Sequence, residues 1–189
     1  MGNQIKEAIS FLKQGELVIY PTESSYAIGA DFLNPKAIEK VHALKQEPKD
    51  KPLGIIISNL NQIKSIASLN LSAIKLANKF FPGQLNLIVK KIDSEETISF
   101  RIPNNPITLE LASKFDSPIT ATSANIHNSP ALYEIEEIKR TFQDKVSLII
   151  DAGDLNEKIP VSTIFDTTKN KTLRQGLITE AQILDLLKQ

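Results

Sequence analysis

Short apolar runs rich in β-branched residues alternate with amphipathic helical segments along this 189-residue chain, and this alternation constrains the fold most. Runs typical of covered strands lie at residues 17–20, 52–57, 85–89, 119–122, 146–150 and 162–165. Apolar residues recur with helical spacing at residues 5–13, 37–44, 63–67, 74–81, 109–115 and 135–142. A capping-box pattern at Thr179 and Gln182 opens a last helix. Without repeats or linkers, these elements predict a single mixed α/β domain with a twisted sheet over residues 1–189.

The first covered strand runs directly into a cluster of hydroxyl groups. Pro21 cannot donate to a ladder, so we expect the strand to end there. The cluster consists of Thr22, Ser24, Ser25 and Tyr26. Hydroxyls at the exit of an α/β strand suit a polar ligand held by neutral hydrogen bonds. A turn that bonds its own backbone has the same composition, so the residues alone leave both interpretations open.

Residues 97–102 alternate strictly between polar and apolar side chains. The alternation places Thr97, Ser99 and Arg101 on one face of a strand and three apolar residues on the other. An antiparallel strand with one solvated face has this pattern. The functional alternative is a strand that faces a cavity, in which Arg101 forks onto a carboxylate or phosphate.

Further polar side chains follow other predicted strands. Ser123 and Asn125 come after the strand at 119–122, where Asn125 either binds a ligand or closes an Asx turn. Ser162 lies at a strand edge, and Arg174 is an isolated cation before the last helix. These positions suit neutral hydrogen bonding with only a few charges.

The loop at residues 45–52 is the most charged segment between a helix and a covered strand. It carries Lys45, Lys49 and Lys51 against Glu47. Such loops are usually only solvated. The position of this loop also suits phosphate contact.

Composition and motifs exclude several function classes. Lys plus Arg and Asp plus Glu each number 22, so no net field attracts nucleic acid or membranes. The chain has no cysteine, which excludes disulfides and thiolate sites. Nucleotide-binding glycine loops and a nucleophile elbow are missing from the sequence. Neither His42 nor His127 has a carboxylate or a second histidine at metal-ligand spacing, so we expect surface or packing roles for them, and the sequence identifies no metal ligands.

The chain also lacks the sequence signals of membrane insertion or export. No apolar run approaches the ~20 residues that span a bilayer. The first 14 residues lack the apolar core and cleavage site of a signal peptide. We therefore expect a cytoplasmic protein with no membrane contact.

Seven short segments carry a family resemblance when they are taken together and in order. They are Pro21-Thr22-Glu23-Ser24 with Tyr26 and Gly29, Lys45 with Pro48 and Lys51-Pro52-Leu53, Phe81-Pro82-Gly83-Gln84-Leu85, Phe100-Arg101-Ile102-Pro103, Thr122-Ser123-Ala124-Asn125, Ser162-Thr163-Ile164 with Asp166, and Arg174 with Gly176. In this register they resemble the YrdC/TsaC family of threonylcarbamoyl-adenylate synthases. The resemblance implies an open, twisted, mixed α/β sheet with helices around a large cationic cavity.

The resemblance also implies a reaction and its partners. Family members convert L-threonine, bicarbonate and ATP to threonylcarbamoyl-AMP and pyrophosphate. A separate transferase uses this product to modify an adenosine beside the anticodon of certain tRNAs, so tRNA or the transferase complex is an expected partner. The amine of threonine would first form a carbamate, whose oxygen would attack the α-phosphate of ATP. Mg²⁺ is the expected cofactor, bound with ATP.

The resemblance assigns roles to residues of this chain position by position. The expected threonine-binding residues are Ser24, Arg101, Ser123 and Ser162. The expected ATP-binding residues are Lys45, Lys51, Thr97, Asn125 and Arg174. Lys45 and Arg174 are the expected catalytic residues, because they would stabilise the charge that develops on the phosphates.

Three positions depart from the family pattern. Glu47 stands where the family has an arginine, Tyr26-Ala27 replaces tyrosine-glycine, and His127-Asn128 replaces serine-glycine. A carboxylate cannot sit on a triphosphate, so we expect Glu47 to turn away, to pair with Lys49 or to help hold a metal ion. The alternative function is a nucleotide- or RNA-binding module of this fold without synthase activity.

Overall fold

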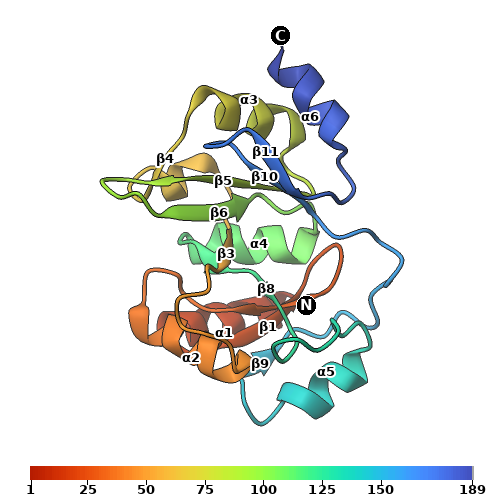
Figure 1. Cartoon of the computed structure of the whole chain (residues 1–189). Coiled ribbons are helices and arrows are strands. Elements are labelled where there is room, and N and C mark those ends of the chain that lie inside the picture. The colour runs from red at the N-terminus through yellow and green to blue at the C-terminus, as the bar shows by residue number, and fades with distance from the viewer. Residues whose placement is uncertain (189) are drawn as a thin grey trace.

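The computed structural model describes residues 1–188 and contains two open, mixed sheets, one above the other in the view of Figure 1. The first sheet has the strand order β8-β2-β1-β9. Its strands are β1 (Val18–Pro21), β2 (Tyr26–Gly29), β8 (Thr122–Ser123) and β9 (Leu148–Ile149). β1 pairs antiparallel with β2 and parallel with β9. The first sheet therefore joins segments from the two halves of the sequence.

The second sheet has the order β11-β10-β5-β6-β3-β7, and β4 pairs with β5 beside this path. Its strands are β3 (Gly54–Ile56), β4 (Ala67–Ser68), β5 (Leu85–Lys91), β6 (Thr97–Arg101), β7 (Ile119–Thr120), β10 (Thr163–Asp166) and β11 (Lys171–Arg174). β6 pairs antiparallel with β5 and parallel with β3. This mixture of directions confirms the predicted mixed α/β class, although the strands form two sheets and not one.

Six α-helices and one 3₁₀-helix surround these sheets within residues 1–188 (Figure 1). They are α1 (Gly2–Lys13), α2 (Pro35–Lys45), α3 (Leu71–Phe80), α4 (Pro106–Phe115), α5 (Ile135–Phe142), α6 (Glu180–Leu187) and η1 (Leu60–Ile63). α4 lies between the two sheets and packs against α1 and β1. α3 and α6 pack together on the second sheet.

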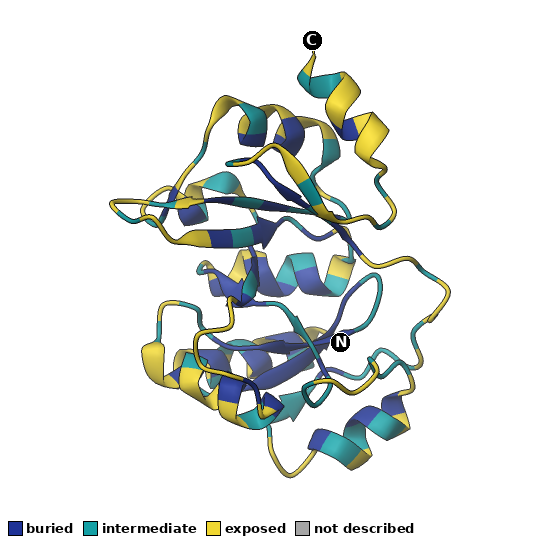
Figure 2. Ribbon diagram, in the orientation of Figure 1, coloured by how far each residue is buried: buried dark blue, intermediate teal, exposed yellow. Residues whose placement is uncertain are grey.

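The alternation along β1 explains why this strand lies at the centre of the molecule. Val18 and Tyr20 pack into one apolar cluster with α1 and α4. Ile19 packs into another cluster with α2 and α5. Since successive side chains of a strand point to opposite faces, helices cover β1 on both sides. Figure 2 shows the resulting buried centre of the lower half.

Polar caps start the helices where the sequence predicts them. Asn34 accepts hydrogen bonds from the backbone N–H groups of Lys36 and Ala37 and starts α2, as expected from the Asn-Pro signal. Thr179 and Gln182 form the predicted capping box of α6. These local signals act within one helical turn, so they can be identified from sequence.

Several predicted elements were wrong because tertiary pairing overrides local pattern. The helix expected at 63–67 is absent; η1 ends at Ile63, and Ala67 pairs with Lys91 of β5. The strand expected at 119–122 is divided, since β7 pairs with β3 in one sheet and β8 pairs with β2 in the other. The sequence interpretation also missed β2, β4 and β11, short strands that depend on their partners.

The hydroxyl of Tyr20 connects the first sheet to β7. It is fully buried and donates to the backbone carbonyl of Thr120 at 2.7 Å. We expect Tyr20→Phe to lower the free energy of unfolding by about 1–3 kcal/mol, because it leaves a buried carbonyl without a donor. Urea unfolding measures this change. Tyr133→Phe is the control, since the half-buried Tyr133 hydroxyl has no protein partner within residues 1–188; equal stability losses in the two variants would contradict the prediction.

Candidate functional site

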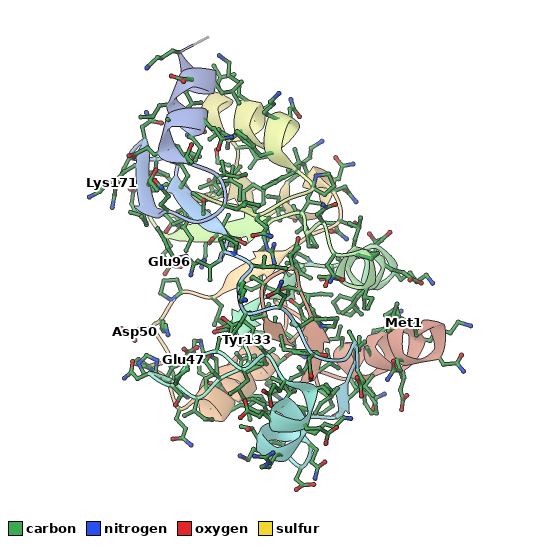
Figure 3. All side chains as sticks on the ribbon, turned by 90° about the vertical axis from the view of Figure 1, so that its right-hand side faces the viewer. Met1, Glu47, Asp50, Glu96, Tyr133 and Lys171 are labelled. Atoms are coloured by element: carbon green, nitrogen blue, oxygen red, sulfur yellow. The ribbon has the colours of Figure 1, made fainter. Side chains whose placement is uncertain are left out.

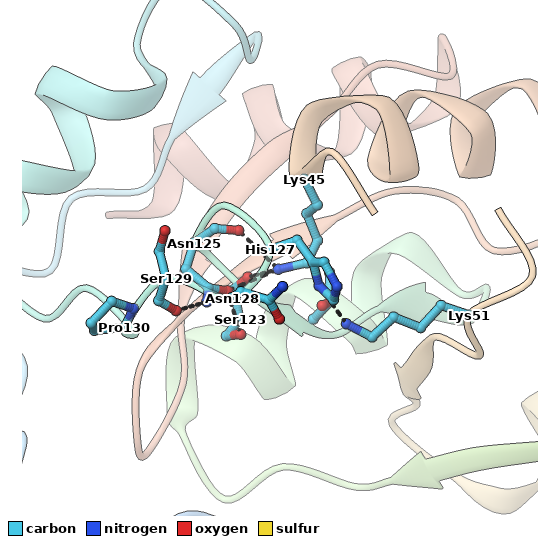
Figure 4. Close-up of a pocket in the computed structure, with 9 residues that line it drawn as sticks. Lys45, Lys51, Ser123, Asn125, His127, Asn128, Ser129 and Pro130 are labelled. Carbon is cyan, nitrogen blue, oxygen red and sulfur yellow. Dashed lines mark hydrogen bonds between the residues drawn. The ribbon is translucent and has the colours of Figure 1, made fainter. Parts of the chain in front are cut away.

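A pocket of about 440 Å³ opens where the loop after α2 meets the loop after β8 (Figure 4). Lys45 and Lys51 approach from the first loop. Ser123, Asn125 and His127 lie on the second. Among the described residues that line it, the pocket has basic groups, hydroxyls and amides but no Asp or Glu. Such a lining suits an anionic ligand.

Lys45 is a buried lysine at the end of α2 that holds the opposite loop in place. Its Nζ donates to the backbone oxygen of Ser123 at 2.6 Å, and to the side-chain and backbone oxygens of Asn125 at 2.9 and 3.0 Å. An ammonium group has three N–H donors, so these contacts use all of them. A phosphate oxygen can therefore bond Lys45 only by replacing one of these acceptors.

The environment of Lys45 also changes its titration. Burial lowers its pKa to about 8, with a further lowering from Lys51 and an opposite effect from the Glu47 carboxylate. Lys45 is therefore charged at neutral pH but loses its proton in the mildly alkaline range.

Asn125 connects three parts of the pocket wall. Its Oδ1 accepts from Lys45 and from the Ser123 hydroxyl, the latter at 2.7 Å. Its Nδ2 donates to the backbone oxygen of Ser129. Asn125 therefore holds the loop in shape, and Ser123 lies next to Asn125 on the pocket wall. Asn125 does not close an Asx turn, because the backbone N–H of His127 donates to the Lys45 carbonyl and not to Asn125 Oδ1. Ligand binding by Asn125 stays a prediction.

Glu47 is the most unusual group near the pocket, because its charged side chain is fully buried. Its Oε2 lies 2.8 Å from Lys51 Nζ and 4.0 Å from His127 Nδ1, and its Oε1 lies 3.4 Å from His42 Nδ1. Figure 3 shows Glu47 on the side of the view opposite Met1. Glu47 thus faces three basic side chains from three segments.

These contacts correct one prediction and add a partner to two residues. Lys49 does not pair with Glu47; it lies 3.5 Å from Glu39 on the protein surface. His42 and His127, for which we expected packing or surface roles, both face Glu47. The physical reason is the left-handed backbone at Gln46, which ends α2 and folds the loop back toward the helix.

A second polar cluster contains Arg101 at the end of β6. Its guanidinium is almost entirely buried and donates to Glu23 at 2.8 Å. Glu23 also accepts from the backbone N–H of Asn104. The ion pair connects the β1–β2 turn to the end of β6 through Nη1 of Arg101, and the Asn104 hydrogen bond connects the same turn to the loop before α4.

Arg174 on β11 belongs to the same electrostatic environment. Partial burial and the nearby Arg101 charge lower the pKa of Arg174. Its Nε and Nη2 donate to the backbone oxygen of Ser162 at 3.1 and 2.9 Å, while part of the residue stays exposed. The Arg101 and Arg174 charges thus lie close enough to affect each other, and among the described residues Glu23 pairs with Arg101 alone. This excess of positive charge favours a further anion.

The remaining predicted residues lie in different places. Ser24 is half-buried in the turn beside Glu23. The neighbouring Thr22 hydroxyl donates to the Ser25 carbonyl at 2.7 Å, so for Thr22 the self-bonded turn is confirmed. Thr97 is exposed at the start of β6 and lines another pocket, of about 720 Å³, which also includes Lys51.

The predicted site residues therefore form two groups, with Ser24 and Thr97 outside both. Lys45, Lys51, Ser123 and Asn125 surround the 440 Å³ pocket. Arg101, Arg174 and Ser162 form the arginine cluster. The sequence analysis missed the roles of Glu23 and the two histidines. Glu23 belongs to the first motif, but no sequence spacing relates residue 23 to residue 101.

Residues 1–188 contain neither a membrane-spanning helix nor a cluster of metal-ligating side chains. None of the helices there is long and apolar enough to cross a membrane. Across the same described residues, no three His, Cys, Asp or Glu side chains come together as a set of metal ligands.

Comparison with known proteins extends the resemblance over most of the chain. Residues 10–176 match the Sua5/YciO/YrdC family model, which carries the description "Telomere recombination". A Methanocaldococcus jannaschii protein is 36% identical across 92% of this chain and 87% of its own length. A Bacillus subtilis protein named threonylcarbamoyl-AMP synthase is 31% identical, and the match covers 95% of this chain but only 55% of that protein.

A solved structure also resembles the fold closely. Sua5 from Pyrococcus abyssi, complexed with L-threonine, has a TM-score of 0.88 and 32% sequence identity, over 97% of this chain and 57% of that one. The present chain thus spans little more than half the length of these last two relatives. The family model covers well over half of the sequence, and so this chain belongs to the Sua5/YciO/YrdC family.

Proposed function

We propose that this protein is a threonylcarbamoyl-AMP synthase that converts L-threonine, bicarbonate and ATP to threonylcarbamoyl-AMP and pyrophosphate. The observation that carries the proposal is the grouping of distant motif residues into two basic clusters. One contains Lys45 and Lys51, and the other contains Arg101 and Arg174. ATP is anionic and threonine carries a carboxylate group, so both substrates offer negatively charged groups to this arrangement. The names of the relatives and the threonine complex of the Pyrococcus protein support the same reaction.

Threonine binding falls to Arg101 and three serines in this proposal. Among residues 1–188, Glu23 is the one acceptor bonded to the Arg101 guanidinium. Its remaining N–H donors suit the threonine carboxylate, because a guanidinium fork matches a carboxylate in two parallel bonds. The hydroxyls of Ser24, Ser123 and Ser162 would accept from or donate to the amine, hydroxyl and carbamate of the substrate.

ATP binding falls to Lys45, Lys51, Thr97, Asn125 and Arg174. Lys51 is 44% exposed on the pocket, so its ammonium can reach phosphate oxygens directly. Lys45 acts through its charge and through the loop that it holds. Arg174 uses Nε and Nη2 on Ser162 and keeps Nη1 for a phosphate.

The proposed reaction forms two bonds in sequence. The threonine amine nitrogen bonds to the carbon of bicarbonate, and water leaves, which gives a carbamate. A carbamate oxygen then attacks the α-phosphorus, the bond from that phosphorus to the bridging oxygen breaks, and pyrophosphate leaves with the electron pair. Negative charge grows on the phosphates, so Lys45, Lys51 and Arg174 lower the barrier by electrostatic stabilisation.

The lining of the 440 Å³ pocket does not fit a dedicated Mg²⁺ site. Magnesium in nucleotide sites is usually held by one or two carboxylates together with phosphate oxygens. Among residues 1–188 no carboxylate lines the 440 Å³ pocket, and Glu47 is surrounded by bases. We therefore propose that Mg²⁺ arrives as the ATP complex, and we assign it no protein ligand.

The product would be consumed by a separate transferase that modifies a tRNA adenosine. A mixed anhydride of a carbamate and AMP is an activated donor, so such a transfer follows from its chemistry. We infer tRNA or the transferase complex as a partner downstream of this protein.

The decisive experiment measures pyrophosphate from the purified chain with ATP, Mg²⁺, L-threonine and bicarbonate. We expect release that depends on all four components, with omission of threonine or bicarbonate as the controls. ATP or RNA binding without pyrophosphate release would contradict the synthase proposal and support a binding module.

A further inference from the structure

Glu47 is a buried carboxylate placed directly behind the wall of the 440 Å³ pocket. We propose that Glu47 is a positioning residue that holds Lys51 and His127 on that wall and so maintains a binding site for a triphosphate. The proposal deepens the proposed function and rests on it. Glu47 is not among the residues that line the pocket.

The exposures of the three side chains support an indirect role. The Glu47 side chain is 0% exposed, whereas those of Lys51 and His127 are 44% and 31% exposed. Lys51 Nζ also lies 3.3 Å from His127 Nδ1, so the two groups on the wall contact each other as well as Glu47. A ligand in the pocket therefore meets Lys51 and His127, and Glu47 acts only through them.

Charge balance explains why a carboxylate is needed here. Glu47 faces His42 from α2, Lys51 from its own loop and His127 from the loop after β8, and Lys45 lies close enough to sense its charge. Without Glu47, the ammonium groups of Lys45 and Lys51 would repel each other across a partly desolvated wall. Glu47 therefore allows both lysines to stay charged beside the pocket.

The titration of Lys45 is consistent with this role. The Glu47 charge raises the pKa of Lys45 and thus opposes the stronger effect of burial, which leaves that pKa at about 8. Removal of the Glu47 charge shifts the pKa of Lys45 further down. Loss of the lysine charge then begins at a lower pH.

Glu47→Gln tests the proposal because it keeps the side-chain shape and removes the charge. We expect inorganic triphosphate and ATP to bind about tenfold more weakly at pH 7.5, with KM for ATP raised and KM for threonine unchanged. The alkaline loss of triphosphate binding should also move to lower pH. Glu39→Gln is the matched control, since Glu39 on α2 makes an exposed pair with Lys49 of the following loop.

The chain offers a direct spectroscopic readout. It has two histidines, and both face Glu47. We expect Glu47→Gln to move the ring proton signals of both in NMR spectra, and Glu39→Gln to move neither. If Glu47→Gln does not fold, Lys51→Gln is the second variant, because it removes the Lys51 ammonium from the Glu47–Lys51 ion pair. We expect this variant to bind triphosphate more weakly and to show shifted ring proton signals for His127.

Unchanged triphosphate affinity in a folded Glu47→Gln or Lys51→Gln protein would overturn the proposal. Native ATP affinity in a folded Glu47→Arg protein would also overturn it, because arginine would place a further cation among His42, Lys51 and His127. Failure of the proposed function is a separate result: the native protein would release no pyrophosphate, while triphosphate binding would still depend on Glu47.

Discussion

Lys45→Met lowers the rate of pyrophosphate release by on the order of 100- to 1,000-fold, the loss typical for one preorganised electrostatic group. Two effects combine in this variant. The charge beside the phosphates is lost, and the Ser123 and Asn125 oxygens lose their common donor. Single-turnover measurements with saturating ATP and threonine separate the chemical step from binding.

The control for Lys45 is an exposed lysine of the same helix. Lys40→Met removes a surface pair with Glu16 and should leave the rate within about twofold, as expected for a surface ion pair. Thermal unfolding of both variants separates loss of activity from loss of fold. A folded Lys45→Met protein with the native rate would contradict the assigned role.

The pH dependence of the native protein tests the same residue. The pKa of Lys45 is lowered to about 8, so the group is charged below this pH and neutral above it. We therefore expect the rate to fall as the pH rises through about 8. Because Lys45→Met has no such group, its residual rate should lack this alkaline fall.

Arg101→Lys raises the threonine concentration for half-maximal pyrophosphate release by about 10- to 100-fold, since lysine cannot form two parallel bonds with a carboxylate. Lysine is a sharper test than an apolar residue. It keeps a cation for Glu23, whereas an apolar residue would leave a buried carboxylate unpaired, at about 3–5 kcal/mol of stability.

Steady-state rates at varied threonine and fixed, saturating ATP give the threonine concentration for half-maximal pyrophosphate release. We expect KM for ATP to change much less than KM for threonine. Arg140→Lys, at an exposed position on α5, is the matched control and should change neither. An unchanged threonine requirement in Arg101→Lys would remove Arg101 from the proposed threonine site.

Much of the fold was predictable because its signals are local. The Asn34 and Thr179 caps fix helix starts within a single turn, and the alternation at residues 97–102 placed Arg101 on the polar face of its strand. The short strands β2 and β11 were not predictable in this way, since each depends on pairing with a neighbouring strand. The division of residues 119–122 between two sheets likewise depends on the tertiary structure.

The sequence by itself determined the mixed α/β class and identified the chemical groups of the candidate site, because caps, strand alternation and motif order are properties of neighbouring residues. Only the tertiary structure decided how those groups are used. In the folded chain Glu23 pairs with Arg101, and Lys45 donates hydrogen bonds to the loop after β8. Glu47 is buried among His42, Lys51 and His127. Glu23 and Arg101, Lys45 and Asn125, and Glu47 and His127 are each about 80 positions apart in the sequence. His42 and Lys51, in contrast, are near neighbours of Glu47. Ion pairs and hydrogen bonds act over a few ångströms, so their partners are set by the folded chain and not by sequence spacing.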